Sequence, residues 1–431
     1  MSSYSASTRR ELLAGLSAGL LSAVLPPRLR AGSRSALPQP AEIDPLSADV
    51  LPPGIRSRFV HDVNGLRMHV LEAGFETAGR PGVLLVHGFP EIAYSWRKLM
   101  PVLASAGYHV VAPDLRGYGR TDGTDVSYDD DLRPFRMINE IRDMLALVSA
   151  FGHRRVHLVG HDFGSLVSAW CAVARPDVFR SVVLMSAPFG GTAVLPFDTV
   201  GRTPDNASLN TAPDIYADLA QLMPPRKHYR SFYATREAND DMWHARQGVH
   251  DFLRAYYHMK SADWPENEPY PLREWSAVEL GKLPHYYVME LNKGMAETVA
   301  AEMPTAAEIA ACQWLPDAEL RIYSAEYGRT GFQGGLQWYR SNTSVSSLFG
   351  RGGVNADLQV FAGRTIDQPS LFIAGVSDWG VYQRPGVVEQ MQTRACTDMR
   401  GVHLVAGAGH WVQQEQPEAV SRLVLQFLQE A

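Results

Sequence analysis

The sequence feature that most constrains the fold is a glycine-flanked turn between an apolar run and a helical pattern. Residues 156–159 are typical of a buried strand, and residues 164–174 carry a helical pattern. The turn between them is GHDFGS, residues 160–165. Glycines allow a strand to reverse sharply into a helix, which places the central Asp162 at the positive end of the helix dipole. The sequence therefore predicts a strand–turn–helix unit that presents a carboxylate at its tip.

Short apolar runs recur on both sides of this turn, and several are bounded by Gly or Pro, as buried strands are. They cover residues 67–72, 83–86, 109–112, 156–159, 182–185, 371–374 and 402–405. Helical patterns lie between them, for example at 139–151. Strands that alternate with helices predict βαβ crossovers, and hence an α/β fold with a mostly parallel central sheet flanked by helices.

The interval 189–368 breaks this alternation. It contains helical-looking segments, many aromatic residues and a Gly-rich stretch near residues 328–335. Because so long a segment is not a structureless loop, we expect an inserted, mainly helical cap domain over the carboxyl ends of the strands. The sheet domain is then divided into a first part, 55–188, and a second part, 369–431.

The amino-terminal segment predicts export. Arg9 and Arg10 precede an apolar stretch, Leu12 to Leu25, which is shorter than the ~20 residues that cross a bilayer. This arrangement resembles a twin-arginine signal, which we assign to residues 1–36, with a linker at 37–54. The expectation is a periplasmic or secreted protein that uses the export machinery, or a membrane-tethered one if the signal is not cleaved. A disordered tail with an accidental arginine pair is the alternative.

Composition excludes several classes of partner. The net charge is −6, so no basic field exists for a phosphate backbone, and nucleic acid is not an expected partner. Three scattered cysteines provide neither a disulfide framework nor a zinc site. No metal-ligand spacing or phosphate-binding loop is visible, so we expect no cofactor and no metal. The oligomeric state is unknown at this stage.

An aspartate at the tip of the turn implies a particular chemistry. A carboxylate is already anionic, so it needs no base before it attacks. It can displace a leaving group from a saturated carbon and form an alkyl ester on the protein. The productive leaving groups are a halide or the strained oxygen of an epoxide.

Hydrolysis of such an ester needs a base held by a second carboxylate. His410 follows the run 402–405 in the loop GAGHW, where an imidazole can reach the turn. Asp378 follows the run 371–374, and the order Asp162, Asp378, His410 is nucleophile, acid, histidine. Asp367 and Asp398 are weaker alternatives for the acid.

Five motifs in this order resemble the soluble epoxide hydrolase branch of the α/β-hydrolases. They are HGFPEIAYSWR (87–97), APDLRGYGRTD (112–122), GHDFGS (160–165), VSDWG (376–380) and GAGHWVQQEQP (407–417). The resemblance implies the α/β-hydrolase fold, with the turn as its nucleophile elbow, and an epoxide hydrolase with a covalent Asp162 hydroxyalkyl ester. It also implies an oxyanion hole from the N–H groups of Phe89 and Phe163, with a cis Phe89-Pro90 bond.

Epoxide hydrolases carry two cap tyrosines that protonate the epoxide oxygen. Tyr339 resembles the second of them, although Gln337 stands where the family often has Asn. Tyr229 takes the place of the first in the segment KHYRSFY. Its rivals are Tyr233, Tyr256 and Tyr257.

Two other functions remain open. A haloalkane or haloacid dehalogenase uses the same nucleophile but usually has Trp or Arg directly after it, where this chain has Phe163. A hydrolase-like binding protein without turnover is the other. Trp96, Trp379 and Trp411 either line the substrate pocket or fill the core. The expected substrate is a small hydrophobic epoxide.

Overall fold

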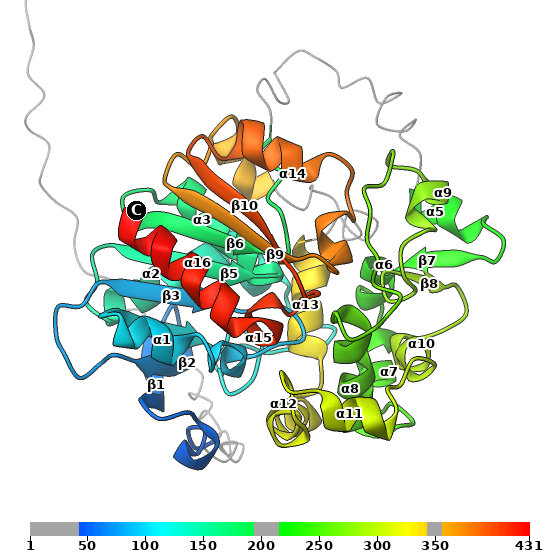
Figure 1. The fold of residues 1–431 in the computed structure, drawn as a ribbon, viewed down its shortest axis with the longest axis horizontal. Coiled ribbons are helices and arrows are strands. Elements are labelled where there is room, and N and C mark those ends of the chain that lie inside the picture. The colour runs from blue at the N-terminus through cyan, green and yellow to red at the C-terminus, as the bar shows by residue number, and fades with distance from the viewer. Residues whose placement is uncertain (1–42, 194–214, 343–355) are drawn as a thin grey trace, which may run out of the picture. The chain divides into compact units, whose positions relative to one another are not determined.

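An eight-stranded sheet forms the centre of the computed structural model, which describes residues 43–193, 215–342 and 356–431 (Figure 1). The strand order is β1-β2-β4-β3-β5-β6-β9-β10, with β1 and β2 antiparallel to their neighbours and the pairs from β4 to β10 parallel. The strands are β1 (Ile55–Val63), β2 (Leu66–Ala73), β3 (Gly82–Val86), β4 (His109–Pro113), β5 (Val156–His161), β6 (Phe179–Met185), β9 (Ser370–Gly375) and β10 (Met399–Val405). The predicted α/β-hydrolase fold with a mostly parallel sheet is confirmed.

Helices cover both faces of this sheet because its strands are apolar on both faces. In β3, Leu84 and Val86 belong to one core cluster, and Val83 and Leu85 belong to the other. The first cluster includes α2 (Met137–Ala150) and α3 (Phe163–Ala174), and the second includes α1 (Met100–Ser105) and α16 (Pro417–Glu430). The short elements α14 (Val387–Gln390) and α15 (Val412–Glu415) complete the second part of the domain.

Residues 215–342 form a separate layer of helices with one small antiparallel sheet, drawn in green and yellow in Figure 1. Its elements are α5 (Ile215–Ala220), β7 (Arg226–His228), α6 (Tyr229–Tyr233), α7 (Glu237–Trp243), α8 (Gly248–Lys260), α9 (Ala277–Leu280), β8 (Val288–Glu290), α10 (Met295–Ala300), α11 (Ala306–Ala311), α12 (Asp317–Thr330) and α13 (Gln333–Asn342). This cap and the sheet belong to one compact unit, residues 44–431. Ring contacts between α13 and the start of α3 join the two layers.

Part of the predicted linker lies on this unit. Leu46 donates its N–H to the Ser57 hydroxyl, and Tyr94 donates its hydroxyl to the carbonyl of Val50. The predicted signal, residues 1–36, lies outside the described residues. Among the residues that are described, no helix has both the length and the apolar character needed to span a membrane.

Candidate active site

The turn after β5 presents Asp162 in a strained backbone conformation. Its φ of 52° lies in the left-handed region, which is unusual for a residue with a side chain. Gly160 and Gly164 are required because neighbouring backbone leaves no room for a side chain. A Cβ on Gly160 would lie 2.1 Å from the carbonyl oxygen of Gly164, and a Cβ on Gly164 would lie 2.0 Å from the carbonyl oxygen of Val86. The strand therefore passes directly into α3 with the carboxylate at the tip.

One oxygen of this carboxylate is held by a backbone donor. The N–H of Phe89 donates to Asp162 Oδ1 at 3.0 Å, and the Phe89-Pro90 bond is cis. Phe163 follows Asp162 and is the first residue of α3, so its N–H is one of the helix-terminal donors without an intrahelical acceptor. The structure thus places both predicted oxyanion-hole residues beside the nucleophile.

His410 lies between the two carboxylates that the sequence assigned to it. Its Nδ1 is 3.2 Å from Asp378 Oδ1, and its Nε2 is 3.4 Å from Asp162 Oδ2. Asp378 also accepts the N–H of Gly380 at 2.7 Å. Nε2 is buried and has no hydrogen-bond partner within the described part of the chain. This arrangement orients the imidazole and leaves Nε2 directed at the nucleophile, where a water can be activated.

The charges around Asp162 keep it ionised. Burial opposes this, but His410, Lys260 and His161 together lower the pKa of Asp162 well below its usual range. Similarly, burial opposes ionisation of Asp378, but its contact with His410 lowers its pKa. Both carboxylates are therefore anionic at neutral pH, as a nucleophile and an orienting acid must be.

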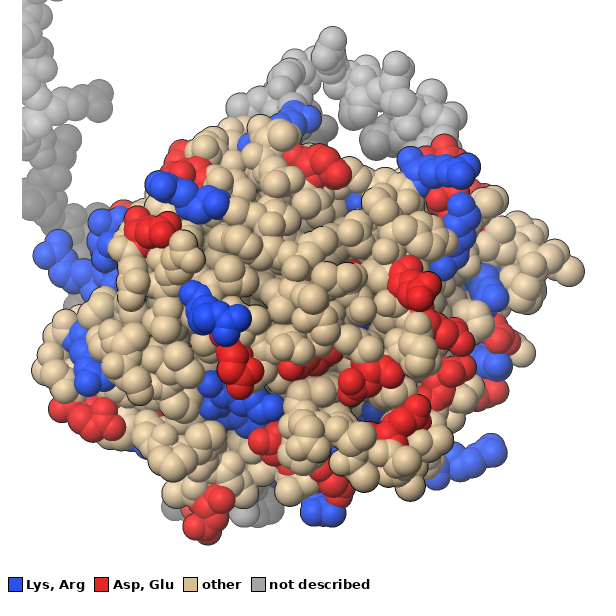
Figure 2. Space-filling model, in the orientation of Figure 1, with Lys and Arg blue, Asp and Glu red and all other residues tan. Residues whose placement is uncertain are grey.

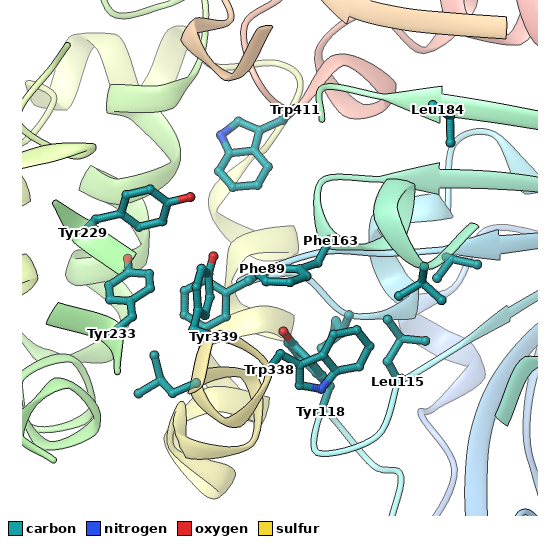
Figure 3. Close-up of a cluster of buried hydrophobic side chains, with 14 of the residues drawn as sticks. Phe89, Leu115, Tyr118, Phe163, Leu184, Tyr229, Tyr233, Trp338, Tyr339 and Trp411 are labelled. Carbon is teal, nitrogen blue, oxygen red and sulfur yellow. The ribbon is translucent and has the colours of Figure 1, made fainter. Parts of the chain in front are cut away.

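The rings of the two predicted cap tyrosines contact each other edge-on beside this site. The rings of Tyr229 and Tyr339 are 5.9 Å apart, and Tyr339 packs on Phe163 at 4.8 Å. In Figure 3 both hydroxyl groups point toward the space below Trp411. Burial is the main cause that raises the pKa of each phenol, and the negative charge of Asp162 also raises it. Both phenols therefore stay protonated, as proton donors require.

Comparison with known proteins identifies the family. Residues 81–272 match the model of the alpha/beta hydrolase fold. The chain is 33% identical to epoxide hydrolase A of Mycobacterium tuberculosis, over 85% of this chain and 95% of that protein. The chain belongs to the epoxide hydrolase family. It is also 31% identical to the epoxide hydrolase of Caballeronia sordidicola, over 85% of this chain and 91% of that protein.

Solved structures of epoxide hydrolases are similar to the whole unit. An epoxide hydrolase from an endophytic Streptomyces matches with a TM-score of 0.66 and 29% identity, over 88% of this chain and 96% of that one. Epoxide hydrolase I of potato, Solanum tuberosum, matches with a TM-score of 0.62 and 26% identity, over 88% of this chain and 100% of that one. The match extends over both the sheet domain and the cap.

Two of the three rivals of Tyr229, Tyr233 and Tyr257, donate their phenolic protons to other groups. Tyr233 donates its hydroxyl to that of Tyr256 at 3.2 Å, and Tyr257 donates to the carbonyl of Pro90 at 3.1 Å. Tyr229 instead accepts a hydrogen bond from Arg230 Nε at 3.2 Å. Because a guanidinium only donates, the phenolic proton of Tyr229 is left for another acceptor. In this member of the epoxide hydrolase family, Arg230 thus positions Tyr229.

A buried network connects the elbow to the loop of His410. His161 contacts Glu91 Oε2 through Nδ1 and the carbonyl of His410 through Nε2, each at 2.7 Å. Both acceptors lack protons, so both ring nitrogens must donate and His161 is an imidazolium. Burial opposes that charge, but Glu91 raises the pKa of His161. Gln413 and Gln414 donate to Glu91 Oε1 at 2.9 and 2.8 Å.

The three predicted tryptophans do not lie together. Trp411 is buried and lies above Tyr229 and Tyr339 in Figure 3. Its ring packs on that of Tyr257 with centroids 4.4 Å apart, and its Nε1 donates to the carbonyl of that residue. Trp379 follows Asp378 and packs on Tyr270. Trp96 belongs to the core cluster on the other face of the sheet and is not brought into this group.

Proposed function

We propose that this chain hydrolyses an epoxide to a vicinal diol through an ester on Asp162. The observation that carries this proposal is the position of an ionised elbow carboxylate between His410 and two buried cap phenols. Attack by a carboxylate can displace several leaving groups, including a halide and an epoxide oxygen. Two protonated phenols favour the epoxide, because its oxygen becomes an alkoxide that needs a proton.

The first step opens the ring. Phe89 holds Oδ1 of Asp162, and Oδ2 attacks an oxirane carbon. The carbon–oxygen bond of the ring breaks as the new ester bond forms, and the ring oxygen takes a proton from Tyr229 or Tyr339. The product is a hydroxyalkyl ester and a tyrosinate. Positioned proton donors of this kind contribute about 10² to 10⁴ in rate.

The second step cleaves the ester at its carboxyl carbon. His410 takes a proton from water, and the hydroxyl attacks Asp162 while the N–H groups of Phe89 and Phe163 stabilise the oxyanion. The ester bond then breaks, the departing alkoxide takes the proton from His410, and the diol is released. The carboxylic acid then ionises, and its proton restores the tyrosine. Asp378 stabilises the imidazolium between these transfers.

Product analysis tests the function. We would measure diol and halide release from aryl epoxides, alkyl epoxides and haloalkanes, using residues 37–431 beside Asp162→Asn. Diol formation that is lost in the variant is the expected result. Halide release without diol would identify a dehalogenase instead. Turnover of no compound, with ligand binding retained in Asp162→Asn, would favour a binding protein.

We also propose that the chain is exported through a twin-arginine signal at residues 1–36. Its support is the pair Arg9-Arg10 ahead of a short apolar stretch. A fusion of residues 1–40 to a reporter should leave the cytoplasm, and the fusion with Arg9→Lys and Arg10→Lys should not. Retention of both fusions in the cytoplasm would refute the proposal.

A further inference from the structure

Glu415, the last residue of α15, is buried and accepts three backbone N–H groups. Its Oε2 accepts those of Ala262 and Gly409, each at 2.8 Å, and its Oε1 accepts that of Trp411 at 2.9 Å. Gly409 and Trp411 are the two neighbours of His410 along the chain. One carboxylate therefore holds the backbone on both sides of the base.

The side-chain contacts of His410 fix its imidazole only in part. Its Nδ1 lies 3.2 and 3.3 Å from the two oxygens of Asp378, whereas hydrogen bonds to a carboxylate are typically about 2.7 to 2.9 Å. Its Nε2 has no hydrogen-bond partner in the part of the chain that the structure describes. The direction of Nε2 toward Asp162 therefore depends on where the backbone of His410 is held.

The peptide groups of His410 have partners of their own. Its N–H donates to the carbonyl of Lys260 at 2.8 Å. Its carbonyl accepts bonds from His161 Nε2 at 2.7 Å and from Ser186 Oγ at 3.0 Å. These bonds hold one residue, and Glu415 holds the residues before and after it. Together they fix three consecutive residues of the loop.

Gly409 brings this loop directly against the cap. A Cβ on Gly409 would lie 2.5 Å from the carbonyl oxygen of Lys260 and 2.8 Å from the nitrogen of Ala262, so no other residue fits there. Glu415 lies at this contact and bonds to both sides of it. A glutamine would serve less well, because its amide N–H₂ group would meet a backbone N–H.

The second step of the proposed reaction depends on the position of His410, and the first does not. In the first step an ionised Asp162 attacks while the N–H of Phe89 holds its Oδ1. In the second step Nε2 must take a proton from a water that attacks the carboxyl carbon of Asp162. A misplacement of about 1 Å in such a step can cost about 10²-fold in rate.

We propose that Glu415 is a positioning residue for the hydrolysis of the ester. It acts through the backbone on both sides of His410 and keeps Nε2 directed at the carboxyl carbon of Asp162. This role rests on the proposed epoxide hydrolysis, because only an ester intermediate needs the base in its second step.

Separate rates for the two steps test this role. We would follow single turnovers of styrene oxide by rapid quenching and intact protein mass spectrometry. In Glu415→Gln, ester formation should stay within about threefold of the original rate, and ester hydrolysis should slow about 10- to 100-fold, so that alkylated protein accumulates. Gln416→Ala is the matched control, because Gln416 donates to the carbonyl of Gly407 on the exposed side of the same loop. Both rates should stay within about threefold in the control.

Two results would overturn the inference: unchanged ester hydrolysis in Glu415→Gln, and an equal loss in both steps, which would assign Glu415 to stability alone. If Glu415→Gln does not fold, Glu415→Asp replaces it. That variant retains the charge, but its side chain is one methylene shorter, which draws the oxygens away from the three N–H groups. The same selective loss of ester hydrolysis supports the inference, and equal losses refute it. Absence of diol from styrene oxide with the original protein would instead mark failure of the proposed function.

Discussion

The Nε2 atom of His410 lies 3.4 Å from Oδ2 of Asp162 and forms no hydrogen bond to any group in the described residues. Asp162 is already ionised, so it needs no base for its own attack. A gap at Nε2 instead suits a base that acts on water after the carboxylate has become an ester. An ionised Asp162 therefore attacks in a first step without the base, and His410 is required in the second step, when water cleaves the ester.

This division predicts a trapped intermediate in His410→Gln. Ring opening should proceed, because Asp162 is already ionised, but hydrolysis of the ester should nearly stop. We expect one equivalent of epoxide to be consumed and intact protein mass spectrometry to show the added alkyl group. Asp162→Asn, as the control, should consume none. Steady turnover in His410→Gln would contradict the assigned roles.

The cap tyrosines should act on the first step. Tyr339→Phe and Tyr229→Phe should each slow single-turnover ester formation, and the double variant should lose about 10² to 10⁴ in rate. Tyr257→Phe is the matched control, because its hydroxyl bonds to the carbonyl of Pro90. That variant should lower thermal stability and retain the ester-forming rate. A double variant with an unchanged rate would refute proton donation.

Arg230 should act through Tyr229. Removal of its hydrogen bond in Arg230→Met should slow ester formation about tenfold, as expected for a bond to a charged donor. The same substitution in Tyr229→Phe should have no further effect, since the acceptor is absent. Single-turnover rates for the four proteins of this cycle measure the coupling. If the two substitutions lowered the rate independently, so that their effects multiplied in the double variant, Arg230 would act on a group other than Tyr229.

The lowered pKa of Asp114 predicts that the folded protein loses stability in acid. Burial opposes its charge, but His69 and the N–H of Arg120 contribute to lowering its pKa from 3.8 to about 2. Because the folded-state pKa is the lower one, its stabilising effect is complete above the unfolded value and is lost as the pH falls from about 4 to about 2, a loss of about 2 kcal/mol. Urea unfolding across this range should show the slope, and Asp114→Asn should remove it. An unchanged slope in the variant would contradict this.

Residues next to strand ends were predictable from the sequence, and residues of the cap were less so. Asp162, Asp378 and His410 each follow an apolar run, and parallel strands bring their carboxyl ends to one edge. Cap residues lack this guide: Tyr229 was distinguished from its rivals only by resemblance. The signal for Lys260 was a charge on an apolar helix face, four residues after Tyr256 and eight after Phe252.

Other parts depended on contacts between distant segments. Trp96 stands in a motif beside the oxyanion loop, yet it packs in the core on the opposite face of the sheet, because it lies in a short 3₁₀ helix (Ala93–Trp96) and not at the end of a strand. The ion pair of Glu91 with His161 joins the loop after β3 to the last residue of β5, seventy residues away. No local pattern predicts this pair, because Glu91 and His161 belong to different motifs and only the fold brings them together.

The most direct test of the account is a single turnover in water enriched with a heavy oxygen isotope, with excess enzyme over styrene oxide. The ester mechanism predicts that the first diol carries ordinary oxygen from Asp162, and that the peptide containing Asp162 gains one heavy oxygen by mass spectrometry. Heavy oxygen in the first diol, with an unlabelled Asp162 peptide, would show that water attacks the epoxide directly and would contradict the ester mechanism.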